Sequence, residues 1–367
     1  MSLIKINGNW GEGGGAIVRV ALALSTVTQN PFEISDIRKG RKDAGLKNQH
    51  LYCVKSLQEL CNAEVEGTEL GSSYLKYSPN KLVAKNLNID IQTAGSITLL
   101  LQALIPPAIF VNKPVRITIV GGTNVKWSPS YDYFNNVLLP QLQRLAGIQA
   151  TLLKRGYYPK GNGSVEVNIQ PKFRLNDFSS FDKFYEHLKQ NVNKINLADQ
   201  HKLIQIKGIS HASKDLQQAK VAERQAESAE LMLRKRFSVP VNATIEYQDT
   251  MSTGCGITLW AVFSKNKDDI DASNPIRIGS DSLGEQGKRS ETVGEEAAKN
   301  LIREIESKAA VDGHLADQIL PYLALIRGST IRTSEITNHC KTNIYTIQQF
   351  MGEIFRIDEK EKIVSVK

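Results

Sequence analysis

The feature that most constrains this chain is a glycine-rich stretch close to its N-terminus. Five glycines and one carboxylate, within residues 8–15, separate an apolar segment (3–6) from a segment of small residues (16–25). This order predicts a strand, a tight turn and a helix. Glycine allows positive φ angles and close approach to a ligand, and a helix N-terminus offers unpaired N–H groups. The loop suits phosphates or a ligand-bound metal, although a turn without a ligand fits the spacing equally well.

Two nucleotide-binding patterns can be compared with this loop. The Walker pattern is absent, because no Gly-Lys-Ser/Thr follows the glycines. The dinucleotide fingerprint is nearly met by Gly11, Gly13 and Ala16, with Asp36 about twenty residues further on. However, Glu12 would place a negative charge beside a pyrophosphate. A carboxylate there is better suited to a divalent cation that faces phosphate oxygens, so Glu12 is the predicted metal ligand and dinucleotide binding ranks second.

Composition narrows the class of protein. A chain of 367 residues exceeds one ordinary domain, and its net charge of +8 weakly favours polyanionic partners. The longest apolar stretch (97–111) is interrupted by Gln102 and by two prolines, so no membrane span is expected. No charged-then-apolar leader precedes Gly8, and the four cysteines form no Cys-x-x-Cys pair. We therefore expect a cytoplasmic protein with reduced thiols and no membrane partner.

The pattern of strand, glycine turn and helix recurs along the chain and predicts a mixed α/β (α+β) fold with three βαβαββ units. Its predicted strands span 31–37, 87–91, 115–120, 148–154 and 164–169, with helices at 51–61, 97–104, 134–146, 290–309 and 315–325 and paired strands out to Val366.

A segment without this glycine pattern interrupts the repeats. It predicts strands at 203–209, 243–248 and 256–263 and a charged helix at 219–236. The predicted organisation is a large domain with repeats 1 and 2 (1–177), an inserted α/β domain (178–278), and repeat 3 of the large domain (279–367).

A basic loop follows the second predicted strand. Five cations occur within residues 38–47, followed by Gln49 and His50 at the start of a helix. This loop favours anion binding by Arg38 and Arg41, with Gln49 and His50 as further phosphate contacts. A solvated loop with surface salt bridges, and a plain helix cap at Gln49, are the alternatives.

Seven motifs in order, spanning essentially the whole chain, resemble the RNA 3′-terminal phosphate cyclase family. They are Gly11-Glu12-Gly13-Gly14-Gly15 with Arg19; Ile37-Arg38 with Arg41 and Gln49-His50; Ala94-Gly95-Ser96 with Gln102; Gly121-Gly122-Thr123 with Pro129 and Asp132-Tyr133; Arg155-Gly156-Tyr157-Tyr158-Pro159; Leu315-Ala316-Asp317-Gln318; and His339-x-x-Thr342-Asn343. The resemblance implies three repeats similar to the C-terminal domain of a bacterial translation initiation factor, with a smaller α/β insert.

The resemblance also implies an activity: ATP-dependent conversion of an RNA 3′-phosphate into a 2′,3′-cyclic phosphate. A histidine takes AMP from ATP, the RNA 3′-phosphate takes the AMP, and the neighbouring 2′-hydroxyl displaces AMP and closes the ring. The implied partners are RNA with a 3′-phosphate end, ATP, and Mg²⁺ or Mn²⁺. This order of the three steps is physically sound. A terminal phosphate has no good leaving group until it becomes an anhydride, and neutral imidazole is a nucleophile near pH 7.

The family's nucleophile lies in a His-x-x-Thr-Asn segment, which here begins at His339. His314 precedes Leu-Ala-Asp-Gln, where the family often has an aromatic residue that stacks on adenine. We therefore predict His339 as the nucleophile and His314 as an ATP contact. The three histidines of the insert (His187, His201 and His211) are expected at the surface.

The resemblance implies roles for the remaining positions. Glu12, Arg19 and Arg41 would act with His339 in catalysis. ATP would contact Gln102, Pro129, His314, Asp317 and Gln318, and RNA phosphate would contact Arg38, Gln49 and His50. A simple turn role for Pro129 fits as well, and Gln102 needs a polar partner because its helix is apolar.

The sequence departs from the family pattern in places. Ala44 stands where a proline often precedes the glycine, Asn162 interrupts a glycine run, and His314 replaces the common aromatic residue. None of these removes a charge or the nucleophile. A non-catalytic, cyclase-like ribosome-assembly protein is the competing hypothesis, and the presence of Glu12 and His339 favours the enzyme.

Overall fold

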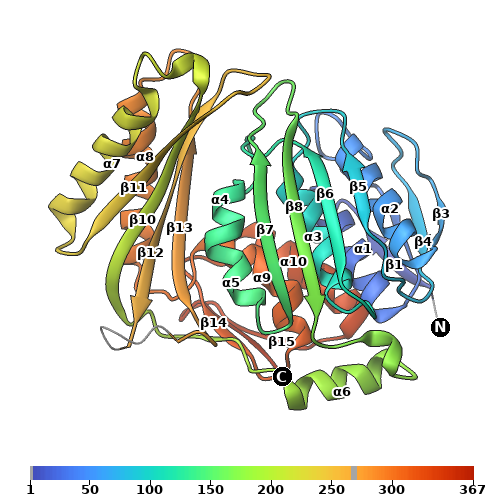
Figure 1. The fold of residues 1–367 in the computed structure, drawn as a ribbon. Coiled ribbons are helices and arrows are strands. Elements are labelled where there is room, and N and C mark those ends of the chain that lie inside the picture. Colours follow the sequence, from blue (N-terminus) through green and yellow to red (C-terminus); the bar gives the residue numbers. More distant parts are fainter. Residues whose placement is uncertain (1–2, 266–270) are drawn as a thin grey trace.

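The computed structural model describes residues 3–265 and 271–367, which contain four four-stranded mixed sheets. Figure 1 shows the sheets with their helices as a single broad molecule, in which one sheet and two helices stand apart at the left. Three of the sheets share one strand order, first-second-fourth-third, and in each the first two strands are parallel. The three βαβαββ units predicted from the sequence are confirmed by this common topology.

The first unit is built from residues 4–78. Its strand β2 lies parallel to β1 and antiparallel to β4. The prediction of a strand before the glycines and a helix after them is confirmed, and β3 and β4 were not predicted. The elements of this unit are β1 (Ile4–Asn7), α1 (Ala16–Thr28), β2 (Phe32–Ser35), α2 (Asn48–Cys61), β3 (Glu64–Glu66) and β4 (Leu75–Ser78).

The second unit repeats this order in residues 87–171, and its predicted helix at 134–146 is only partly correct. The helix contains a π-helical turn and ends at Leu142, and Ala146 already begins a strand. Pro140 offers no N–H to the carbonyl one turn earlier, which accounts for the widened turn. The elements are β5 (Leu87–Asp90), α3 (Ile97–Ala108), β6 (Val115–Gly121), α4 (Tyr131–Tyr133), the π-helical turn (Phe134–Leu138), α5 (Leu139–Leu142), β7 (Ala146–Lys154) and β8 (Gly163–Pro171).

The third unit is split along the chain, because its first strand, β9, pairs in parallel with β14 far downstream. The sequence predicted only strands after residue 325, and that prediction is wrong for α10. Thr337 caps this helix through its hydroxyl, which accepts a hydrogen bond from the Cys340 N–H, and Gly352 ends it with a φ of 73°. The elements are β9 (Asn196–Leu197), α9 (Gly313–Leu325), β14 (Thr330–Arg332), α10 (Asn338–Met351), β15 (Phe355–Asp358) and β16 (Ile363–Val366).

The fourth sheet, with order β11-β10-β12-β13, belongs to the segment between β9 and α9. Helices α7 and α8 pack against each other and cover one face of this sheet (Figure 1). Its elements are β10 (Lys202–Ser213), α7 (Val221–Arg236), β11 (Val241–Gln248), β12 (Cys255–Ser264), β13 (Ile276–Leu283) and α8 (Ser290–Glu306).

The packing of helix α6 (Phe181–Asn191) indicates where the inserted segment begins. The helix packs on the large body, because the Phe184 ring meets Phe110 edge-on and the Tyr185 hydroxyl donates to the Ala324 carbonyl. The domain boundaries at 178 and 279 stay a prediction, and we propose residues 198–312 as the interruption of the third repeat.

Helix α1 organises the interior of the large body. All its residues are buried, and it packs against both α3 and α10. The glycine loop at its N-terminus is therefore held between segments of all three repeats. No helix in the described ranges is long and apolar enough to cross a membrane.

Candidate functional site

The glycine loop between β1 and α1 lies tightly against two other elements. Gly11 and Gly13 have φ angles of 58° and 56°, a conformation that L side chains rarely adopt. A Cβ atom on Gly15 would lie 2.3 Å from His50 Nε2, and one on Gly11 would lie 2.7 Å from Thr342 Oγ1. Both substitutions would force the loop away from α2 and α10. The glycines are therefore needed for this loop to lie between the two helices.

At the centre of the site, the loop carboxylate meets a histidine of α10. The Nδ1 atom of His339 lies 2.5 Å from Oε2 of Glu12, and the Arg41 guanidinium lies 3.5 Å from the other carboxylate oxygen. Arg41 also donates to the Glu12 carbonyl at 3.1 Å. The predicted catalytic residues Glu12, Arg41 and His339 are thus neighbours in space.

The protonation state of His339 follows from its surroundings. Partial burial lowers the pKa of its imidazole below 6.5, as do Arg19, Arg41 and His314, while Glu12 acts in the opposite direction. The ring is therefore largely neutral near pH 7. Because Nδ1 faces the carboxylate, the favoured tautomer keeps its proton on Nδ1 and leaves the lone pair on Nε2.

A hydrogen-bonded clamp holds the start of α10, where His339 lies. Thr337 Oγ1 donates to Asp317 Oδ1 at 2.5 Å, and Asn343 Nδ2 donates to the Asp317 carbonyl at 2.7 Å. Asp317 belongs to α9, so this clamp ties α9 to α10. Burial raises the pKa of Asp317 to about 7. The carboxyl is consequently half protonated near neutral pH.

A buried cation lies beneath the glycine loop. Arg19 is 8% exposed, and its Nε donates to Gln102 Oε1 at 3.2 Å. Among the described residues it forms no ion pair with a carboxylate, and burial lowers its pKa to about 10. Arg38, whose guanidinium donates to the Asp43 carbonyl, lies close enough for its charge to lower the pKa of Arg19 further. A buried charge without a counterion favours an anionic ligand.

His50 and Gln49 lie at the start of α2, beside this cation. The His50 ring is buried, and its Nδ1 accepts a hydrogen bond from the Lys47 N–H at 3.0 Å. Burial, followed by Arg19 and two further cations, lowers its pKa to about 3, so the ring is neutral. Gln49 is half-buried near Gly95. Phosphate contact by either residue stays a prediction, and we propose that His50 supports the loop at Gly15.

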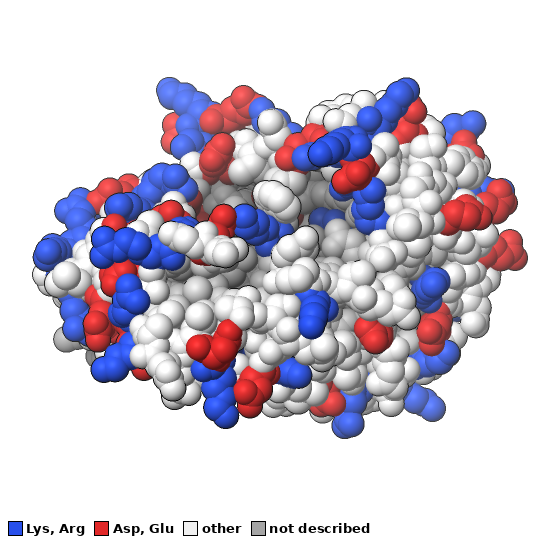
Figure 2. All heavy atoms as spheres, turned by 90° about the horizontal axis from the view of Figure 1, so that it is seen from above, with Lys and Arg blue, Asp and Glu red and all other residues white. Residues whose placement is uncertain are grey.

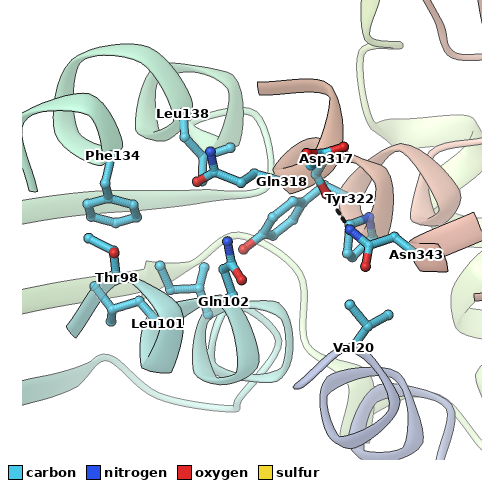
Figure 3. A pocket seen from close by; sticks show the side chains of 12 residues that line it. Val20, Thr98, Leu101, Gln102, Phe134, Leu138, Asp317, Gln318, Tyr322 and Asn343 are labelled. Atoms are coloured by element: carbon cyan, nitrogen blue, oxygen red, sulfur yellow. Dashed lines mark hydrogen bonds between the residues drawn. The ribbon is translucent and has the colours of Figure 1, made fainter. Parts of the chain in front are cut away.

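The predicted nucleotide residues surround one narrow pocket. Gln102, Asp317 and Gln318 line it together with residues that the sequence did not indicate, including Phe134 and Tyr322. Figure 3 shows α3 and α9 facing each other across this space, with α1 and α10 at its side. The cavity is about 20 Å³, enough for roughly one water molecule. Phe134 and Tyr322 could not be found from sequence, because apolar residues in helices look like ordinary core.

The other two predicted nucleotide residues lie around this pocket. The Pro129 carbonyl accepts a hydrogen bond from Thr98, which is a lining residue. His314 is exposed on the first turn of α9, with its ring edge-on to Tyr133 at 6.4 Å. Pro129 therefore lies next to the pocket, bonded to one of its lining residues, and His314 lies at the surface with its ring against Tyr133.

A second polar cluster, whose role the sequence did not indicate, joins the large body to the insert. Arg155 is 1% exposed and pairs with Asp132 at 2.7 Å and with Glu246 at 2.6 Å. His211 adjoins it and bonds the Tyr157 hydroxyl at 2.8 Å. The expectation that His211 is a surface residue is wrong, because its ring is buried at this junction.

A possible metal site depends on how the carboxylates are grouped. The described residues contain no group of three or more His, Cys, Asp or Glu side chains placed to hold a metal. Oε2 of Glu12 is buried and lies 2.5 Å from Nδ1 of His339, whereas Oε1 lies 3.5 Å from the Arg41 guanidinium. A carboxylate in this glycine loop fits Mg²⁺, which is often held by one or two carboxylates plus substrate phosphates.

The face seen from above Figure 1 is hollowed between its two sides. Figure 2 shows Lys and Arg side chains along both flanks of the hollow and within it. Acidic side chains are interspersed with them, so the surface is not uniformly basic. The hollow nevertheless gives a polyanion a cationic approach.

Comparison with known proteins gives a consistent result. The family model described as RNA 3′-terminal phosphate cyclase matches residues 10–357. A protein of that name from Methanosarcina acetivorans is 41% identical over 99% of this chain and 99% of its own length. Another from Thermococcus gammatolerans is 40% identical over 98% of this chain and 95% of its own, and one from Pyrococcus abyssi is 40% identical over 97% and 95%.

Proposed function

This chain belongs to the RNA 3′-terminal phosphate cyclase family, and on that premise we propose an ATP-dependent reaction through AMP covalently bound to His339. RNA 3′-phosphate ends would be converted into 2′,3′-cyclic phosphates. The observation that supports this most strongly is the contact between His339 and Glu12 inside the glycine loop. An imidazole with a lowered pKa thus lies beside a carboxylate and close to a buried cation, which supports the proposal.

In the first step, Nε2 of His339 attacks the α-phosphorus of ATP. A P–N bond forms, the bond to the β-phosphate oxygen breaks, and pyrophosphate leaves with the electron pair. Glu12, beside Nδ1, orients the ring and stabilises the positive charge that develops on it. The lowered pKa of His339 keeps the lone pair available at neutral pH.

The cations of the site have a direct role in this step. Phosphoryl oxygens carry more negative charge in the transition state, and Arg19, Arg38 and Arg41 would neutralise it. Arg19 is suited to this because it is buried without a carboxylate partner among the described residues. The N–H groups at the start of α1 would add donors to the same phosphates.

A divalent cation would be held by the Glu12 carboxylate through Oε1, since Oε2 contacts Nδ1 of His339. Bound Mg²⁺ or Mn²⁺ supplies charge neutralisation at the phosphates. The adenine would lie beside Pro129 and His314, at the mouth of the pocket that Gln102, Asp317 and Gln318 line. Since the cavity is only about 20 Å³, side chains of its wall would have to move as the base enters.

The last two steps transfer AMP and close the ring. A 3′-phosphate oxygen of RNA attacks the phosphorus of the adduct, and Nε2 of His339 leaves as neutral imidazole. The vicinal 2′-hydroxyl then attacks the 3′-phosphorus, its proton passes to solvent and AMP departs with the electron pair, which the short distance between these groups favours.

The test is to incubate the protein with ATP, Mg²⁺ and an oligoribonucleotide that ends in a 3′-phosphate. We expect the end to become resistant to phosphatase, with one AMP and one pyrophosphate released per end. A matched oligonucleotide with a 2′-deoxy terminal sugar should stop at the RNA–AMP anhydride. An end that stays sensitive to phosphatase would contradict the proposal.

A further inference from the structure

The loop at residues 123–130 displays an aromatic ring that packs on almost nothing. Trp127 is 95% exposed, the highest value among the exposed large apolar residues of the described ranges. Its φ angle is 60°, a left-handed conformation that is an outlier for a bulky residue. Such strain persists where the surroundings enforce it, and it gathers at ligand sites. Here the strained backbone gains no packing of its own ring, so burial does not explain it.

Beside this ring lies an open cleft of about 380 Å³, between the 123–130 loop and the insert. Its walls include Lys126, Trp127, Ser130, Asp281 and Lys288. Lys126 pairs with Glu285 across the cleft at 2.9 Å, and Lys288 pairs with Glu296. The volume lies within the range of small-molecule sites, roughly 300–1,000 Å³. The cleft therefore has an aromatic side chain at its rim and polar side chains inside, which suits a flat, polar ring such as a base.

A second exposed ring lies on the neighbouring loop. Tyr158 is 77% exposed, and its loop is joined to the first by the Thr123 N–H, which donates to the Gly156 carbonyl at 3.0 Å. Lys160, on the same loop, is exposed and forms no ion pair within the described residues. Both loops lie at the upper edge of Figure 1, where β6 and β7 end. Exposed rings interleaved with cations are typical of surfaces that bind single-stranded nucleic acid.

The ring and the reaction pocket are connected through one short stretch of chain. Pro129, two residues after Trp127, accepts a hydrogen bond from Thr98 at 2.7 Å, and Thr98 lines the pocket. With the adenine at the mouth of this pocket, an RNA strand whose 3′-phosphate reaches His339 would approach from outside the pocket, and the 123–130 loop adjoins the pocket there. The platform therefore lies where upstream nucleotides would pass.

We propose that Trp127 is a stacking platform for a base upstream of the 3′-phosphate in single-stranded RNA, with Lys126 and Lys160 near the RNA backbone. The inference rests on the proposed function for the direction of the strand. A protein partner would need a contiguous apolar surface, whereas Trp127 is flanked by Lys126 and Ser128 and adjoins a polar cleft.

The test measures binding of a 3′-phosphorylated RNA decamer, by fluorescence anisotropy and without ATP, so that no chemistry is needed. Trp127→Ala should weaken binding about tenfold, because loss of one stacked base is worth about that factor. Trp127→Phe should keep most of the affinity, since it keeps an aromatic face. Leu231→Ala, which shortens an exposed apolar side chain elsewhere, on α7, should leave the affinity for the decamer unchanged.

Two further binding measurements show which nucleotide of the RNA depends on Trp127. A nucleoside 3′-phosphate, which ends before the platform, should compete equally well against wild type and Trp127→Ala. An abasic nucleotide at the stacked position should remove the difference between the two proteins. Formation of AMP–protein from ATP alone should be the same in both.

The proposal is overturned if Trp127→Ala binds the decamer as wild type does. It is also overturned if Trp127→Phe loses as much affinity for the decamer as Trp127→Ala does. The same holds if the nucleoside 3′-phosphate competes less well against Trp127→Ala than against wild type. If no variant forms an AMP adduct while RNA affinity still depends on Trp127, the proposed chemistry fails and the platform stands.

Discussion

Nδ1 of His339 lies 2.5 Å from Oε2 of Glu12, and this contact joins the two ends of the chain. Glu12 belongs to the glycine loop of the first repeat, and His339 lies on the first turn of α10 in the third. The Thr342 hydroxyl, one helical turn beyond His339, also accepts a hydrogen bond from the Glu12 N–H at 3.4 Å. His339, the proposed nucleophile, therefore meets Glu12 only when the first and third repeats are packed together.

The two candidate histidines should behave differently when each is replaced by alanine. His339→Ala should abolish AMP–protein formation from labelled ATP, because within residues 3–265 and 271–367 no other histidine contacts Glu12. His314→Ala should keep the adduct and weaken ATP binding about fivefold, the loss expected for one ring contact of about 1 kcal/mol. Titration with ATP separates the two effects. An adduct that survives His339→Ala and disappears in His314→Ala would reverse the assignment.

Replacing the loop carboxylate tests its two proposed functions together. Glu12→Gln keeps the shape of the side chain and removes its charge, so adduct formation should slow by roughly a hundredfold. The concentration of Mn²⁺ needed for half-maximal rate should rise, since the metal loses its protein ligand. Glu335→Gln, at an exposed position shortly before α10, is the matched control and should match wild type. An unchanged metal requirement would exclude Glu12 as the metal ligand.

The rate of adduct formation should depend on the ionisation of His339. Its pKa is lowered, so the nucleophile stays neutral as the pH falls to 6.5, and the acidic limb of the rate profile should lie below 6.5. Arg41 contributes to this lowering, and Arg41→Gln should therefore move the limb to higher pH. Arg356→Gln, which alters an exposed residue of β15, should leave it in place. A limb that does not move in Arg41→Gln would contradict the electrostatic explanation.

Asp317 should make the protein less stable as the pH rises. Burial raises its pKa from 3.8 to about 7 in the folded protein. The folded state thus favours the neutral carboxyl, and the stability that this group contributes is complete below pH 4 and is lost as the pH passes through 7. The shift corresponds to roughly 4 kcal/mol. Asp317→Asn cannot titrate, so this part of the pH dependence should vanish from its free energy of unfolding.

Urea denaturation at several pH values between 4 and 8 measures this difference. Asp249→Asn, which changes a carboxylate with an 83% exposed side chain, is the control and should follow wild type. If wild type and Asp317→Asn differ by a constant amount across this range, Asp317 does not titrate as stated.

Much of the fold could be predicted because its repeats follow local rules. Glycines after apolar runs marked the turns at residues 8–15 and 92–96, and small or apolar residues after them marked α1 and α3. Helix α10 was missed although it carries cues of its own. Thr337 is an N-cap residue, and Cys340, Ile344 and Ile347 repeat at helical spacing. Interpreting the whole C-terminal region as strands hid this pattern.

The site was predicted less completely, since its geometry depends on contacts between repeats. The sequence could not show that His50 is enclosed under Gly15, or that Phe134 and Tyr322 line the pocket with Gln102. Nor could it show that His211 and Arg155 meet at the junction with the insert, because the partners come from β10, β11 and two loops of the large body. Such contacts are set by tertiary packing.

The most direct test of the account is to locate the AMP on the protein. The protein is incubated with α-phosphate-labelled ATP and Mg²⁺ in the absence of RNA, digested, and the labelled peptide is sequenced by mass spectrometry. We predict one AMP per chain on His339, in a bond that survives alkali and is released by acid, as expected for a phosphoramidate. An AMP on any other residue, or no adduct with intact protein, would contradict the central claim.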